Sequence, residues 1–141
     1  MSRSGYTDDC ENLWLWRGAV IRAMSGKRGQ AALQDIAAAL DKMPEKKLAA
    51  NSFQRAGDPC TLGVLSLHRG VDMEDLEPDV DHEWGAEMVD RDLVGNRLDI
   101  APAMAAEVMF TNDEGCYGVE TPQERWLRMR AWVAKNLKDR A

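Results

Sequence analysis

The chain has 141 residues, of which 45% are hydrophobic and 30% charged, and its net charge is -6. This is the composition of a globular protein with a core, and it excludes a disordered tail or a fibre. No apolar run approaches the roughly 18 residues that a membrane span needs, and the polar, acidic opening lacks the pattern of an export signal. We therefore expect one folded domain over residues 1–141.

Apolar residues recur at helical spacing from the beginning of the chain. They predict a first helix over Glu11–Met24, ended by Ser25-Gly26. A second helix, over Gly29–Lys42, has high helix propensity and must end before Pro44. A third, short helix is expected over Glu45–Phe53. The apolar stripe of the second helix consists of Ala32, Leu33, Ile36, Ala37 and Leu40.

The segment Asp58–Gly70 admits two interpretations. Asp58-Pro59 matches a helix N-cap followed by the first helical residue, and Gly70 matches the residue after a helix end. The apolar run Thr61–Leu67 equally fits a short buried strand. A helix is favoured because no partner strand is visible elsewhere and a lone strand cannot satisfy its own hydrogen bonds.

Two further helices are expected in the second half of the chain, over Val80–Asp90 and Leu98–Phe110. Pro102 lies within the first turn of the latter, where proline is tolerated. These elements and a last helix after Thr121 predict an all-α protein, a single compact bundle of five to seven helices.

The clearest local signal is Thr121-Pro122-Gln123-Glu124, a capping box with proline at the first helical position. Apolar residues follow at helical spacing, so the core side of this helix is expected to carry Trp126, Met129, Val133 and Leu137. The same spacing leaves Arg128, Lys135 and Lys138 in solvent. The remaining tryptophans near helix faces, Trp14, Trp16 and Trp132, are also expected in the core.

Charge is distributed unevenly along the chain. Residues 72–120 contain 15 Asp or Glu residues against two arginines, a local charge of -13, whereas residues 121–141 come to +4. Such a stretch is either a solvated, solubilising face or a surface that steers a basic partner. As a protein-binding surface it would use Asp72, Glu74, Asp75, Glu77, Asp79, Asp81, Glu83, Glu87 and Asp90.

Catalytic and metal-binding patterns are weak. The chain has two histidines, His68 and His82, and residues 79–85 fail the calcium-loop template because the glycine comes one place late. Pairing Cys60 or Cys116 with His68 lacks any orienting motif. We therefore expect no enzyme activity, no metal site and no cofactor. The three widely spaced cysteines indicate reduced thiols rather than disulfides.

A basic element, Gly26-Lys27-Arg28-Gly29, stands where the second helix begins. Free amides and the helix dipole attract phosphate at such a point, although the spacing is not that of a P-loop. Lys27, Arg28 and Arg128 are thus an alternative anion-binding set. A charged turn between two helices explains the same residues without a ligand.

The stretch SRSGYTDDCENLWLWRGAVIRAMSGKRGQAAL resembles the opening of small proteins encoded by phages and prophages of proteobacteria. MPEKKL, GDPCTLGVL, MFTNDEG and ETPQERWLRMRAWV are similar to later parts of the same family, so the resemblance covers nearly the whole chain. It implies an accessory protein acting in the bacterial host cytoplasm. It brings no catalytic motif and no functional residues.

Small acidic helical phage proteins often occupy a host protein, such as a CRISPR effector or a restriction enzyme. By this analogy the leading hypothesis is a non-enzymatic binder that inhibits or redirects a host or phage protein with a basic surface. The alternative is a nucleic-acid-associated protein. It would use the basic turn at residues 26–29 and the basic residues of the last helix, Arg125, Arg128, Arg130, Lys135 and Lys138.

Overall fold

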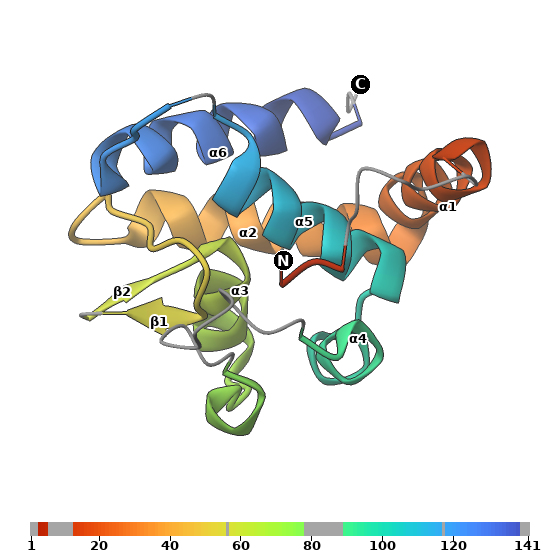
Figure 1. Ribbon diagram of the computed structural model, residues 1–141, viewed down its shortest axis with the longest axis horizontal. Coiled ribbons are helices and arrows are strands. Elements are labelled where there is room, and N and C mark those ends of the chain that lie inside the picture. The colour runs from red at the N-terminus through yellow and green to blue at the C-terminus, as the bar shows by residue number, and fades with distance from the viewer. Residues whose placement is uncertain (1–2, 6–12, 56, 78–88, 117, 139–141) are drawn as a thin grey trace.

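The computed structural model describes residues 3–5, 13–55, 57–77, 89–116 and 118–138, and within these ranges it contains six α-helices and a two-stranded hairpin (Figure 1). The elements are α1 (Leu13–Ser25), α2 (Lys27–Lys42), β1 (Gln54–Arg55), β2 (Asp58–Pro59), α3 (Thr61–Arg69), the 3-10 turn η1 (Glu74–Leu76), α4 (Arg91–Leu98), α5 (Pro102–Glu114) and α6 (Pro122–Asn136). The predicted all-α bundle is confirmed. None of the described helices is long and apolar enough to cross a membrane.

Helix α2 lies at the centre of the bundle and contacts α1, α3 and α6 (Figure 1). Its predicted stripe of alanine, leucine and isoleucine is buried, as the amphipathic spacing required. The helix begins two residues earlier than predicted because Gly26 takes the extended conformation of an N-cap. Between α1 and α2 the backbones approach closely at Gly29, where an added Cβ would lie 1.9 Å from the carbonyl oxygen of Ala23.

The short helix predicted over Glu45–Phe53 is wrong. This segment runs without helix into β1, which pairs antiparallel with β2, and Gly57 between the strands has a φ of +86°. The amide of Leu48 donates to the carbonyl of Pro122, at the start of α6. Partners far along the chain therefore replace the local helical bonds that the sequence suggested.

The segment after the hairpin is the helix α3, as predicted, with Gly70 in the left-handed conformation at its end. The predicted start is wrong, because Asp58-Pro59 forms β2. Cys60 is the N-cap instead, and its Sγ accepts a hydrogen bond from the amide of Gly63 at 3.4 Å. The alternative strand over residues 61–67 is thereby excluded.

Helix α4 was not predicted. Its N-cap is Asp90, whose side chain accepts from the amides of Asp92 and Leu93, and it ends at Asp99, which has a φ of +59°. The predicted helix over Leu98–Phe110 is corrected accordingly to Pro102–Glu114, because the left-handed residue separates two helices. The helix predicted over residues 80–90 lies mostly outside the described residues, and residues 89–90 are not helical.

The capping box of α6 is confirmed. The Thr121 Oγ1 accepts from the amide of Glu124 at 3.1 Å, and the Glu124 carboxylate accepts from the amide of Thr121 at 3.0 Å. Met129 and Val133 are fully buried, as predicted. The other aromatic and apolar residues of this face are partly buried and pack against the core, namely Trp126, Trp132 and Leu137. The side chains of Trp14 and Trp16 lie outside the described part.

Candidate protein-binding site

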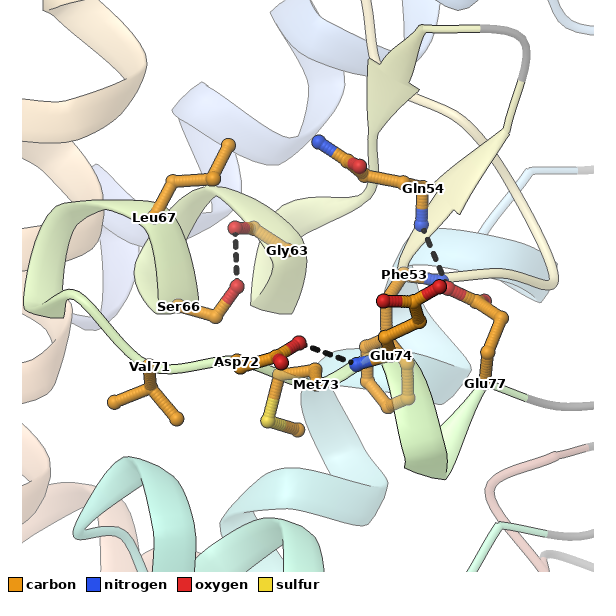
Figure 2. A pocket seen from close by; sticks show the side chains of 10 residues that line it. All are labelled: Phe53, Gln54, Gly63, Ser66, Leu67, Val71, Asp72, Met73, Glu74 and Glu77. Atoms are coloured by element: carbon orange, nitrogen blue, oxygen red, sulfur yellow. Dashed lines mark hydrogen bonds between the residues drawn. The ribbon is translucent and has the colours of Figure 1, made fainter.

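A hollow of about 500 Å³ opens between α3, β1 and the segment that leads from α3 into η1 (Figure 2). This volume is within the range of about 300–1,000 Å³ typical of ligand pockets. Its lining is part apolar and part acidic. The apolar side chains are Phe53, Leu67, Val71 and Met73, and the acidic ones are Asp72, Glu74 and Glu77. We call it the acidic pocket.

The turn at the end of α3 creates the acidic pocket. With Gly70 in the left-handed conformation, the amide of Val71 donates back to the carbonyl of Ser66 at 2.8 Å and the chain reverses direction. The Asp72 carboxylate then accepts from the amide of Glu74 at 2.9 Å and starts η1. The acidic residues after the turn are thus brought alongside the helix that precedes it.

Glu77 joins this segment to the hairpin. Its Oε1 accepts from the Ser52 hydroxyl at 2.5 Å and from the amide of Phe53 at 2.6 Å, and its Oε2 accepts from the amide of Gln54 at 3.2 Å. Figure 2 shows the last of these bonds, which joins Glu77 to the start of β1. All three donors are neutral, and together they hold the Glu77 carboxylate against the start of β1.

Among the described residues, the carboxylates of the acidic pocket take part in no ion pair, although Arg97 lies near Asp72. Ten ion pairs join described side chains, and none includes Asp72, Glu74 or Glu77. Arg97 donates to the backbone carbonyl of Asp72 at 3.3 Å. The hydrogen bond with Asp75, together with the charges of Asp75 and Asp72, raises the pKa of Arg97. An acidic and partly apolar hollow whose carboxylates form no ion pair favours a cationic occupant.

Exposed apolar surface adjoins the acidic pocket. Leu67 on α3 is 61% exposed although it is a large apolar side chain. It also borders a second, shallower groove of about 230 Å³, which contains mainly apolar residues of α2, β2 and α3. Leu67 therefore forms a ridge between an acidic hollow and an apolar one, the mixture of chemistry that protein-binding surfaces use.

The structure divides the predicted acidic surface into residues with different roles. Asp72, Glu74 and Glu77 meet at the acidic pocket. Asp75 instead forms an ion pair with Arg97, whose hydrogen bond lowers the pKa of this carboxyl below its ordinary value. Asp90 caps α4. The remaining predicted residues, Asp79, Asp81, Glu83 and Glu87, lie outside the described residues, as does His82.

The predicted anion-binding set does not come together. Lys27 and Arg28 are exposed in the first turn of α2, but the expectation that Arg128 lies in solvent is wrong. The Arg128 guanidinium pairs with both carboxylate oxygens of Glu120 at 2.7 and 3.0 Å. It also donates to the carbonyls of Thr111 and Asn112 in the last turn of α5. Carbonyls at a helix end attract a cation, which explains the position.

Other arginines of α6 also have partners inside the molecule. Arg125 donates to the Leu48 carbonyl at 2.8 Å, and Arg130 forms a bidentate pair with Asp41 at 2.8 and 3.0 Å. The hydrogen bond from Arg130 lowers the pKa of Asp41. Lys135 and Lys138 are exposed, as predicted. In the described part, the expected basic stripe is thus reduced to Lys135 of α6 and Lys138, which follows the helix.

The pair of Cys60 and His68 that was considered from the sequence is not assembled. Cys60 is buried at the start of α3, whereas His68 lies eight residues further along the same helix. At 1.5 Å per residue this separation is about 12 Å. His68 instead lies 3.8 Å from Asp35 of α2. In the described ranges no three His, Cys, Asp or Glu side chains are grouped to hold a metal ion.

Sequence reasoning missed the walls of the acidic pocket. Phe53 belongs to the helix that was wrongly predicted over Glu45–Phe53, and no binding role was predicted for Leu67, yet both line the hollow. One signal was present: Gly57 lies two residues after β1 and one residue before β2, and a two-residue loop with glycine is typical of a hairpin. Strands of two residues carry too little alternation to be recognised.

Comparison with known proteins supplies no family. No family model, curated protein or solved structure matches this chain. The site must therefore be interpreted from its own geometry.

Proposed function

We propose that this protein is a non-enzymatic binder that attaches to a host or phage protein with a basic surface. In this proposal it is a phage accessory protein acting in the bacterial cytoplasm, and it inhibits or redirects its partner. The observation that supports the proposal is the acidic pocket beside the exposed Leu67, because its three carboxylates belong to none of the ion pairs between described side chains.

Two physical effects favour such a partner. Carboxylates gathered on one face steer a basic protein toward that face and repel acidic ones. The apolar ridge at Leu67 then gives the docked partner area to bury, since electrostatic steering by itself adds more to the association rate than to affinity. Clustered carboxylates beside exposed apolar surface favour binding to a folded protein over catalysis.

Capture from bacterial lysate at low and high salt tests the proposal when a charge-reversal pair is included. Glu74→Lys changes an exposed carboxylate of the acidic pocket, and Glu114→Lys makes the same change at an exposed position of the acidic stretch outside it. We expect a basic protein on the parent and on Glu114→Lys at low salt, and its loss with Glu74→Lys or at high salt. If the Glu74→Lys variant captures the same basic protein as the parent, and high salt does not release it, the proposal is contradicted.

One observation favours nucleic-acid binding as a second candidate. The Gln30 side chain bridges the first turn of α2 to the end of α6, because its Nε2 donates to the carbonyl of Asn136 at 3.1 Å and its Oε1 accepts from the amide of Lys138 at 2.9 Å. The basic residues in the first turn of α2 and at the end of α6 therefore lie at the same end of the molecule. They are Lys27, Arg28, Lys135 and Lys138.

A gel shift with single- and double-stranded DNA and RNA separates the two candidates. Nucleic-acid binding predicts a shift that weakens steeply with salt, because neutralised phosphates release counterions. It further predicts loss of the shift in the double variant Lys27→Glu, Lys135→Glu and its retention in Lys42→Glu, which reverses a cation at the other end of α2. If the protein changes the gel mobility of no nucleic acid at low salt, this candidate is eliminated.

A further inference from the structure

The acidic pocket has the chemistry of a receptor for one kind of side chain. We infer that it receives an arginine side chain from the basic partner, with the guanidinium at Asp72 and Glu74 and the stem along the apolar wall. The inference rests on the proposed function, which it deepens by naming the recognised group.

The charge of the pocket selects a cation. Glu74 is exposed, and Asp72 uses one oxygen to accept from the Glu74 amide, so carboxylate oxygens remain for a ligand. Glu77 adds its negative charge from the hairpin side, where neutral donors hold it in place. An anionic ligand would meet three carboxylates at once. A cation relieves their mutual repulsion.

The apolar part of the lining selects a long side chain over a bare ion. Among the apolar lining residues, Leu67 is 61% exposed and Val71 is half-buried, so a ligand can reach them, whereas Phe53 and Met73 are buried. Basic side chains bury their methylene stems on apolar surface and direct the charged head to polar groups. A hydrated metal ion would gain nothing from these walls, and the described residues hold no metal-ligand group of three.

Arginine fits these walls better than lysine. Its guanidinium is planar and weakly hydrated, and its five donors can reach carboxylates on different segments together, here Asp72 and Glu74. Lysine is a compact and strongly hydrated charge, so it loses more hydration in a hollow that is partly apolar. The difference predicts a preference for arginine beyond simple charge.

Three capped tripeptides provide matched probes for the full chain. They are Ala-Xaa-Ala with arginine, lysine or citrulline at the centre, because citrulline keeps the shape of arginine without its charge. Titration of the isotope-labelled protein to millimolar peptide is followed by the amide NMR signals of Gly63, Leu67 and Val71. We expect saturable shifts at these amides with arginine, weaker binding with lysine, and none with citrulline.

Two variants locate the binding. Glu74→Lys should weaken the arginine peptide by roughly tenfold or more, since a charge-assisted pair becomes a repulsion, whereas Glu114→Lys should leave the affinity unchanged. Thermal melts verify that both variants fold. Equal binding of arginine and citrulline, equal binding of arginine and lysine, or an unaffected Glu74→Lys would each overturn the inference.

The lysate experiment keeps this inference distinct from the proposed function. If Glu74-dependent capture of a basic protein persists while the arginine tripeptide gives no shift, the arginine pocket is wrong and the binding function stands. If the parent captures no basic protein, the proposed function fails. Arginine-specific shifts at the three amides would in that event still support the pocket.

Discussion

Arg3 and Asp113 are 110 residues apart in the sequence and form a bidentate ion pair in the core, with Nε–Oδ2 at 2.6 Å and Nη2–Oδ1 at 3.0 Å. Neither side chain is more than 1% exposed. Burial by itself would lower the pKa of this guanidinium, but Cys60 and Asp113 raise it above its ordinary value. The Arg3 guanidinium also lies over the ring of Phe53, 5.3 Å from its centre. The start of the chain thus supports a residue that lines the acidic pocket.

Removing the carboxylate should cost more than removing the guanidinium. Asp113→Ala leaves Arg3 as an unpaired buried charge and also removes the acceptor of the Asn51 amide and the Asn112 side chain. A loss of about 3–5 kcal/mol in the free energy of unfolding is expected. Arg3→Met should lose less, because Asp113 keeps those two donors. Urea melts measure both variants, and equal losses would show that the two amides matter little to Asp113.

Gly29 and Gly18 should respond in opposite ways to alanine. A Cβ at Gly29 would lie 1.9 Å from the Ala23 carbonyl oxygen, so Gly29→Ala must separate α1 from α2. At Gly18, also helical, the nearest atom to a Cβ is the end of the flexible Arg22 side chain at 3.3 Å. Thermal melts should show a loss of about 1–3 kcal/mol at Gly29 and a gain of up to about 1 kcal/mol at Gly18. A neutral Gly29→Ala would mean that the helices do not touch there.

The Glu120–Arg128 pair should make stability depend on acid pH. Hydrogen bonding to Arg128 lowers the pKa of Glu120 below its ordinary value of 4.5. Because the pKa is lower in the folded state, this stabilisation is complete above about pH 4.5 and is lost as the pH falls through the folded pKa. Glu120→Gln should therefore cost about 1.5–3 kcal/mol near pH 7, and the difference from the parent should shrink in acid.

Urea melts at several pH values between neutrality and pH 3 measure this difference. Glu114→Gln is the control, since it removes an exposed carboxylate at the end of α5. A Glu120→Gln deficit that stays constant over the whole range would show that the pair does not titrate as described.

Thr121→Ala should cost roughly 1 kcal/mol, because it removes the side-chain acceptor for the amide of Glu124. Gln123→Ala in the same turn changes an exposed side chain that is not part of the capping box, so it should be close to neutral. Comparison of the two midpoints of thermal unfolding checks the effect. If the two midpoints were indistinguishable, the start of this helix would be stabilised by its packing and not by its cap.

The elements with local signals could be predicted from the amino-acid sequence. The capping box of α6 sets its start through side chains within three residues, and the buried stripe of α2 follows from a repeat that any helix imposes. Gly70 ended α3 as predicted because only glycine takes the left-handed conformation at no steric cost. These features needed no knowledge of the remaining chain, and they sufficed for the all-α class.

The partners of the charged side chains could not be predicted from the sequence, because they depend on how the elements pack. The spacing of α6 placed Arg128 on the side away from the core, but the end of α5 arrives there with carbonyls that need donors, and Glu120 supplies the counter-charge. The acidic pocket likewise requires α3, β1 and η1 to meet, with Glu77 bonded to amides 23 and 24 residues earlier in the chain. Helical periodicity records which face is apolar, whereas the partner of a long charged side chain depends on segments that adjoin only after folding.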